Sequence, residues 1–216
     1  MSWKNGPIQI DKLENSDEID WFLYLDESGS HEMKTIHRIL SKGKTVTTDD
    51  INFTLTGVLM PRSKQQFIIR QFDKLKNKYW QGGTYYYKNK QQKEKRKVCL
   101  HSYDIRKRKG PFNRDVLTQY DDFVHDLSVL MESLDVKVFS VTIDKEACYN
   151  LNSDVGTYDV YGVATSLLLE SVSKLVAREG VIVIAESRGK RKINCYWILL
   201  SNWSIIMNYE AEVLNL

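Results

Sequence analysis

Residues 21–29 of the chain read W-F-L-Y-L-D-E-S-G. The first five are large and apolar, and such a run with aromatic side chains predicts a buried strand. Two carboxylates follow, Asp26 and Glu27, and then Ser28 and Gly29, which favour a turn. Many α/β enzymes hold a metal ligand where a buried strand ends in acids at a polar edge. Most Asp-Glu pairs, however, simply end a strand in a polar turn.

The flanking segments predict an α/β fold with a mixed sheet. Asn52–Met60 alternates and then becomes wholly apolar, which predicts an inner strand pairing antiparallel with the first and bringing Gly57 near Asp26. Two antiparallel opening strands followed by β/α alternation predict a sheet flanked by helices. The further expected strands are Val98–His101, Val136–Ile143 and Val181–Ala185, and the expected helices are Ser63–Trp80, Asn113–Leu134 and Tyr158–Arg178.

The length of 216 residues suits one domain with a sizeable core. Residues 1–18 are polar and predict a loose lead-in, and residues 19–216 predict a single domain. Three segments of that domain are unusual: a polar loop at 30–50, a basic segment at 84–114, and an aromatic, apolar C-terminal tail at 191–216.

The composition, 42% hydrophobic and 27% charged, is that of a soluble globular protein. The N-terminus has no apolar signal core, and no apolar run approaches the length of a membrane span. The cysteines are odd in number and lack paired spacing, which argues against a disulfide scaffold and a zinc site. We therefore expect a cytoplasmic protein without a membrane partner, and the apolar tail is compatible with a homo-oligomer.

Positive charge is concentrated between residues 88 and 114, where Glu94 and Asp104 are the acids. Such a block favours a polyanionic partner, DNA or RNA, although basic runs are more often solvated surface. The predicted nucleic-acid-binding residues are Lys93, Lys95, Arg96, Lys97, Arg106, Lys107, Arg108 and Lys109, together with Lys190 from the later E-S-R-G-K segment.

Acidic residues follow several predicted strands. Glu186 ends the strand at 181–185 as Asp26 ends the first, and His101 and Asp104 lie in an H-S-Y-D cluster after a short strand. Hard Mg²⁺ or Mn²⁺ prefers oxygen ligands, and paired ions stabilise the attacking and leaving oxygens of a phosphodiester. We predict a site for Mg²⁺ or Mn²⁺ with Asp26, Asp104 and Glu186 as ligands. His101 would belong to the same cluster. Glu27 would either contact these ligands or bind a second ion.

Two cationic residues are candidates for neutralising phosphate charge: Lys145 in I-D-K and Arg188 in E-S-R-G-K. Each candidate also has a simpler explanation. Lys145 can cap the edge of the sheet, Arg188 and Lys190 can be ordinary turn residues, and a histidine such as His101 is more often half-buried at a strand end than a ligand.

Six motifs, in order, resemble the domain of unknown function 3800 family over roughly residues 20–190. The resemblance implies an RNase H-like fold and a metal-dependent nuclease activity, as in similar proteins of bacteria, phages and mobile elements. By position it implies catalytic roles for Asp26, Glu27, His101, Asp104, Lys145, Glu186 and Arg188. The motifs are Y-L-D-E-S-G (24–29), F-T-L-T-G-V (53–58), L-H-S-Y-D-I-R-K-R-K-G-P-F (100–112), I-D-K (143–145), D-V-Y-G…L-L-L-E-S (159–171) and I-A-E-S-R-G-K (184–190).

The chain departs from the family pattern after residue 190, where a further acid and a late Q-L-A-D-like element are missing. Nothing in the spacing of Glu210 and Glu212 makes them substitutes. Loss of a metal ligand would leave a weak or inactive nuclease. Two other functions therefore stay open: a catalytically impaired nucleic-acid- or protein-binding module of the same fold, and a phage-defence or anti-defence factor acting through a protein partner.

Overall fold

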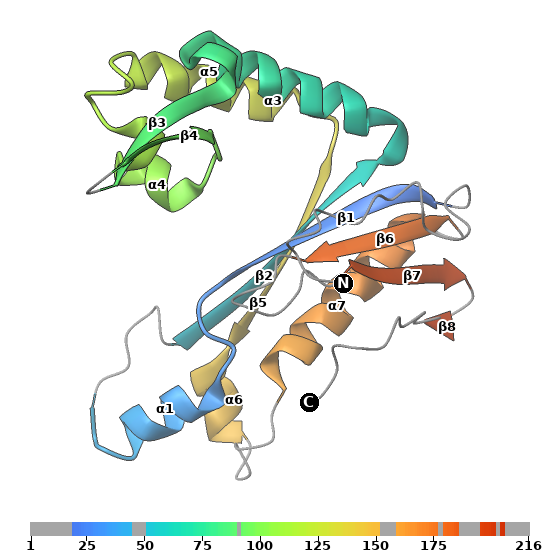
Figure 1. The fold of residues 1–216 in the computed structure, drawn as a ribbon. Coiled ribbons are helices and arrows are strands. Elements are labelled where there is room, and N and C mark those ends of the chain that lie inside the picture. Colours follow the sequence, from blue (N-terminus) through green and yellow to red (C-terminus); the bar gives the residue numbers. More distant parts are fainter. Residues whose placement is uncertain are drawn as a thin grey trace. The chain divides into compact units, whose positions relative to one another are not determined.

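The computed structural model describes residues 19–44, 51–89, 92–151, 159–176, 179–185, 195–201 and 204–205, with backbone alone at 35, 88, 89, 92, 93 and from 195 onward. The chain divides into two compact units. The sheet unit contains the chain up to Arg62 and from Val136 onward, and the inserted unit contains Ser63–Asp135. Both mix helices and strands (Figure 1), so the predicted α/β class is confirmed.

A mixed sheet with the strand order β5-β2-β1-β6-β7-β8 forms the sheet unit (Figure 1). The first strand, β1 (Ile19–Ser28), pairs antiparallel with β2 (Asn52–Pro61) and parallel with β6 (Gly180–Ala185). The predicted opening pair is confirmed, with Leu25 opposite Gly57. The remaining strands all pair antiparallel with their neighbours: β5 (Lys137–Asp144), β7 (Cys195–Ser201) and β8 (Ser204–Ile205).

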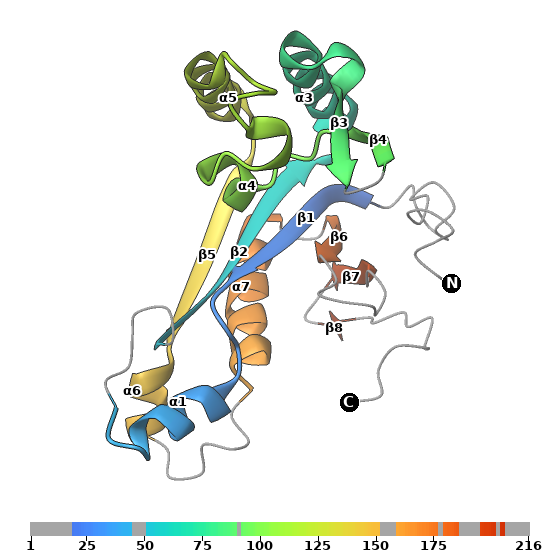
Figure 2. The same cartoon turned by 60° about the vertical axis from the view of Figure 1, so that its left-hand side comes forward.

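One face of this sheet is covered by α7 (Val160–Val176), as Figure 2 shows. The helix turns one apolar stripe inward, and the stripe packs against alternate strand residues such as Leu23, Leu25 and Val183. Gly57 permits close approach, because a Cβ there would lie only 2.9 Å from Leu23 and 3.1 Å from Leu168. The buried stripe comprises Val160, Ala164, Leu168, Val172 and Val176.

Two short helices of the sheet unit were not expected from the sequence. The segment predicted as a polar loop contains α1 (Met33–Leu40), and α6 (Lys145–Leu151) directly follows β5. The two helices contact each other, and the rings of His37 and Tyr149 lie 6.0 Å apart. The loop prediction was wrong at 33–40 because a few buried side chains, Met33 and Ile36 among them, suffice for an otherwise polar helix.

The inserted unit has an aromatic core. Trp80 packs edge-on against Phe112 and Phe123, with centroids 5.5 and 5.2 Å away, and its Nε1 donates a hydrogen bond to the Pro111 carbonyl (3.1 Å). Around this core lie the helices α3 (Gln65–Tyr79), α4 (Ser102–Arg106) and α5 (Tyr120–Ser133). The strands β3 (Thr84–Asn89) and β4 (Gln92–Lys97) form a hairpin beside it. The short 3-10 turns are η4 (Arg62–Lys64), η5 (Gln81–Gly83) and η6 (Gly110–Phe112).

Two predictions for the inserted unit were wrong, and one element was not predicted. The second helix begins at Tyr120 rather than at Asn113, whose Oδ1 accepts a hydrogen bond from the Asp115 N–H (3.0 Å) and closes a turn instead. The segment at 98–101 is irregular, because Val98 alone is buried before the chain enters α4. The basic stretch at 84–97, for which no element was predicted, is a hairpin, because three consecutive tyrosines obscure its alternation in the sequence.

A polar contact joins α3 to α5. The Asp126 carboxylate accepts hydrogen bonds from Lys78 Nζ and from the Tyr79 hydroxyl (2.6 Å). The hydrogen bond from Lys78, and to a lesser extent the one from Tyr79, lowers the pKa of Asp126. The hydrogen bond between Lys78 and Asp126 also raises the pKa of Lys78. The cluster therefore favours the charged forms of both groups in the folded protein.

Replacing Asp126 with Asn should lower the free energy of unfolding at neutral pH, and the loss should shrink in acid. A carboxyl whose pKa is lowered by folding stabilises the protein above its ordinary pKa, and this contribution disappears as the pH falls through the lowered value. Urea unfolding from neutral to acidic pH would measure the trend. Glu132→Gln, an exposed position on the same helix, is the control. A loss that is the same at every pH would contradict the assignment.

Candidate functional site

The end of β1 presents Asp26 to solvent. Leu25 packs against α7, and because side chains alternate along a strand, Asp26 points to the opposite face of the sheet. Its Oδ1 accepts a hydrogen bond from the Glu27 N–H (2.9 Å), and within the described part of the chain no salt bridge neutralises it. Glu27 is half-buried, and by the same alternation its side chain lies on the face of the sheet that α7 covers.

A row of hydroxyl groups lies beside Asp26 on the same face. Asp26 is paired with Thr56, and Thr56 with Ser140, whose hydroxyls are 3.3 Å apart. In the next cross-strand pair on this face, the hydroxyl oxygens of Thr54 and Thr142 lie 2.9 Å apart and form a hydrogen bond. Cross-strand hydroxyl pairs of this kind stabilise a sheet and also offer donors to an anion. The sequence analysis missed them, although T-L-T and S-V-T alternate as a half-exposed strand should.

The neighbouring strand β6 ends near the end of β1. In the parallel ladder Tyr24 is paired with Ile184 and Leu25 with Ala185, the last residue of β6. The two acid-bearing strands are therefore neighbours in the sheet, as a shared metal site requires. The next residue, Glu186, lies outside the described residues, as do Arg188 and Lys190.

The turn after β1 depends on Gly29. Its φ is +85°, a conformation that favours glycine, and a Cβ there would overlap the backbone carbonyl of Asn52. Lys145 closes the turn from the other side, because its fully buried Nζ donates a hydrogen bond to the Ser30 carbonyl (2.7 Å). A buried ammonium presents no surface to a phosphate in solution, so the structure favours a positioning role for Lys145. Asp144, just before it, accepts a hydrogen bond from the Ala147 N–H (2.9 Å) at the start of α6.

His101 and Asp104 belong to the inserted unit. His101 precedes α4 and Asp104 lies in its first turn, with Nδ1 and Oδ2 3.5 Å apart. The His101 side chain is exposed, and that of Asp104 is half-buried. The predicted ligand set of Asp26, Asp104 and Glu186 is thus divided between two units and a segment that is not described.

Carboxylate oxygens are ligands of the right kind for Mg²⁺ or Mn²⁺. Among the described residues, however, no three His, Cys, Asp or Glu side chains gather closely enough to hold a metal ion. The described donors fit such an ion in chemistry but not in number, and the predicted site needs Glu186 in addition.

The predicted nucleic-acid-binding residues of the hairpin differ in their surroundings. Lys95 and Lys97 are exposed, whereas Arg96 forms an ion pair with Glu94 (2.6 Å) and stacks 4.1 Å from the centre of the Tyr87 ring. The side chain of Lys93 lies outside the described residues. Lys95 and Lys97 are therefore better placed than Arg96 to bind an added phosphate.

The second basic group follows α4. Arg108 is half-buried, stacks on the Tyr120 ring at 4.0 Å and lies 3.5 Å from Asp121. Lys109 donates a hydrogen bond to the Tyr103 hydroxyl (3.0 Å). Arg106 and Lys107 are exposed. Arg108 and Lys109 thus contact tyrosine side chains although they lie in the turn that follows α4.

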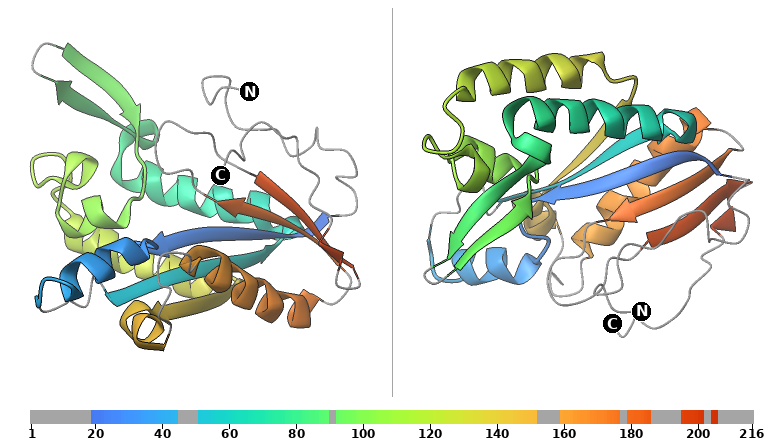
Figure 3. Two further views of the ribbon diagram at one scale, coloured as in Figure 1. Left: turned by 90° about the horizontal axis from the view of Figure 1, so that it is seen from below. Right: turned by 45° about the horizontal axis from the view of Figure 1, so that its top comes forward.

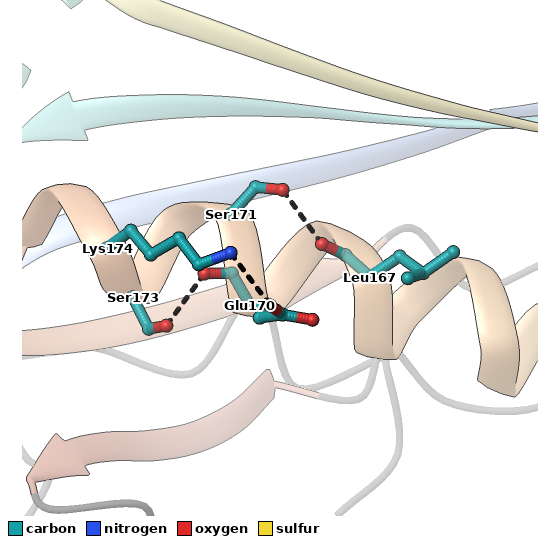
Figure 4. A network of polar contacts seen from close by, with 5 residues as sticks. All are labelled: Leu167, Glu170, Ser171, Ser173 and Lys174. Carbon is teal, nitrogen blue, oxygen red and sulfur yellow. Dashed lines mark hydrogen bonds and ion pairs between the residues drawn. The ribbon is translucent and has the colours of Figure 1, made fainter.

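The acid on α7 within the L-L-L-E-S motif has a local partner. Glu170 accepts a hydrogen bond from Lys174 Nζ (2.8 Å) one turn further on, and the hydroxyls of Ser171 and Ser173 bond back to carbonyls of the same helix (Figure 4). These contacts occupy the outer face of α7, away from the buried stripe. Glu170 is therefore a helix-surface residue, as its position in the sequence indicates.

Comparison of the chain with protein-family models, curated proteins and solved structures finds no match. The resemblance to the domain of unknown function 3800 family thus depends on the sequence motifs and stays a prediction. None of the helices in the described ranges has the length and apolar character needed to cross a membrane.

Gly29→Ala should destabilise the sheet unit far more than Gly43→Ala. Both glycines have positive φ, for which a non-glycine residue costs about 1–3 kcal/mol, but a Cβ at Gly43 meets nothing within 4 Å. The difference between the two variants in chemical denaturation isolates the overlap with the Asn52 carbonyl. Equal losses would show that the turn after β1 is not held against β2.

Proposed function

We propose that the protein is a divalent-metal-dependent nuclease that hydrolyses phosphodiester bonds of DNA or RNA. The observation that supports it most is the register of β1 and β6, in which Leu25 and Ala185 are partners and an acid follows each. Parallel strands lie about 4.8 Å apart. One peptide bond, about 3.8 Å between Cα atoms, connects Ala185 to Glu186. Asp26 and Glu186 are the proposed ligands of a shared cation.

The order of the sheet supports an RNase H-like fold. In chain order the first four strands of the sheet unit are β1, β2, β5 and β6, and in the sheet they lie in the order third, second, first, fourth. The second strand, β2, is antiparallel to both of its neighbours, and the fourth, β6, is parallel to β1. The antiparallel opening pair within a mixed sheet is the part of this arrangement that was expected from the sequence. The departure is β7, which returns antiparallel to β6 in the tail where the family's acidic motif is missing.

The described residues supply binding and positioning. A bound Mg²⁺ or Mn²⁺ would supply Lewis-acid stabilisation of phosphoryl oxygens. Thr56 and Ser140 place hydroxyl donors beside Asp26, suited to orienting a phosphate. Lys145 and Gly29 hold the turn that follows Asp26 and Glu27, and the exposed cations of the inserted unit provide sequence-independent attraction.

A second function, nucleic-acid binding without catalysis, is favoured by a different observation. The exposed lysines of the hairpin belong to the inserted unit, and they need no metal to bind a polyanion. The described acids do not complete a metal site. A protein that has kept the fold and lost a ligand would bind nucleic acid and leave it intact.

Asp26→Asn should abolish cleavage while leaving the fold intact. Asparagine keeps the shape but removes the charge that a hard cation requires, so activity should fall by more than the roughly 10–100-fold typical of losing an outer partner. Labelled single- and double-stranded DNA and RNA would be incubated with Mn²⁺ or with chelator. Without metal, relief of repulsion among nearby carboxylates should keep the melting temperature equal or raise it.

The matched control is Glu32→Gln, which removes the same charge from an exposed side chain a few residues along. It should cleave and respond to Mn²⁺ like the wild type. A wild type that binds nucleic acid without metal-dependent cleavage would favour the binding module. Unchanged cleavage by Asp26→Asn would exclude Asp26 as a ligand.

A further inference from the structure

We infer that the β3–β4 hairpin binds single-stranded nucleic acid in preference to duplex, with Tyr86 stacking on a base and Lys95 and Lys97 contacting phosphates. The inference deepens the proposed function, because it assumes a nucleic-acid ligand and specifies its form. It rests on which face of the hairpin each side chain occupies.

The register separates the hairpin into two chemically different faces. Tyr86 is paired with Lys95 and Thr84 with Lys97, and cross-strand partners share a face. Tyr85 is paired with Arg96 on the other face, where Tyr85 packs against the aromatic core of the inserted unit. The face carrying Tyr86, Lys95 and Lys97 is therefore the outer one, and Figure 3 shows the hairpin extending away from α3.

The outer face combines an aromatic ring with cations. Tyr86 is 62% exposed, although burying such a ring would contribute strongly to stability. Lys95 and Lys97 are both exposed beside it. The described acid of the hairpin, Glu94, belongs to the other face, where Arg96 neutralises it. A flat ring with one lysine opposite it and a second lysine diagonal to it suits a base with its adjoining phosphates.

Stacking distinguishes a single strand from a duplex. A base inside a duplex has both π-faces covered by its neighbours, whereas in a single strand a base can turn outward onto an aromatic side chain. Lysines alone would bind both forms through their phosphates. The exposed ring of Tyr86, on the same face as the two lysines, is therefore the feature that predicts the preference.

The experiment measures binding of a fluorescent oligothymidine, and of a labelled duplex of equal length, by anisotropy with EDTA present. The variants are Tyr86→Ala, Tyr86→Phe and the double change Lys95→Ala/Lys97→Ala. The control is Glu94→Ala/Arg96→Ala, which removes an ion pair from the opposite face at constant net charge. Thermal melts confirm that each variant is folded.

We expect Tyr86→Ala to weaken binding of the single strand about 10-fold, and to leave duplex binding unchanged, because one stacked base is lost. Tyr86→Phe keeps the ring and should bind like the wild type. Replacing both lysines should reduce the salt slope for the single strand by about 1.4, or 0.7 for each phosphate contact. The control pair should leave that slope unchanged.

Equal binding of single strand and duplex by the wild type would overturn the inference. So would a Tyr86→Ala variant with unchanged affinity, an unchanged salt slope in the lysine variant, or no binding to either oligonucleotide. The chelator separates this test from that of the proposed function. If Asp26→Asn loses cleavage but still binds the single strand like the wild type, both the nuclease proposal and the hairpin inference are supported. If the wild type binds the single strand but shows no metal-dependent cleavage, the hairpin inference is supported and the nuclease proposal is not.

Discussion

The position of Asp26 at the candidate site depends on the backbone pairing of β1. This strand lies between β2 and β6 and is hydrogen-bonded on both sides. A slip of one residue would turn Leu25 outward and bring Asp26 under α7, which would bury a carboxylate among apolar side chains. The apolar contacts of Leu23 and Leu25 with α7 thus determine that the acid faces away from the helix.

The same strand shows how stability and chemistry are divided along its length. Its first part is buried, with Phe22 and Leu23 almost without exposure, and its last part carries exposed Asp26 and Ser28. Truncating a core residue such as Leu168 under this strand typically costs about 2–5 kcal/mol. The apolar half can therefore maintain the register, and the exposed carboxylate costs little desolvation as long as it stays in water.

Much of the fold could be predicted from the sequence, because it depends on periodicity. The strands β1, β2, β5 and β6 and the helices α3 and α7 lie within a few residues of their predicted bounds. The start of α5 was predicted too early, because the Asn113 side chain bonds to the backbone and forms a turn there without interrupting the apolar spacing. Short elements such as α1 have too few buried positions to give a signal.

The candidate site could be predicted in part. The apolar runs that precede Asp26 and Glu186 predicted both acids to follow buried strands, but the parallel pairing of those strands came only with the structure. Burial of Lys145 could not be foreseen, because only tertiary packing brings its Nζ to the carbonyl of Ser30, far away in the sequence. The opposite faces of Lys95 and Arg96 follow from strand alternation, but only after the hairpin is known.

The most direct measurement of a shared cation is a double-mutant cycle on Mn²⁺ affinity, using the Asp26→Asn and Glu186→Gln variants and their combination. Two ligands of one ion act together, so either substitution should remove most of the affinity and the second should add little. Free Mn²⁺ would be quantified by electron paramagnetic resonance. Independent, additive effects, or affinity unchanged in either single variant, would contradict a cation held between the ends of β1 and β6.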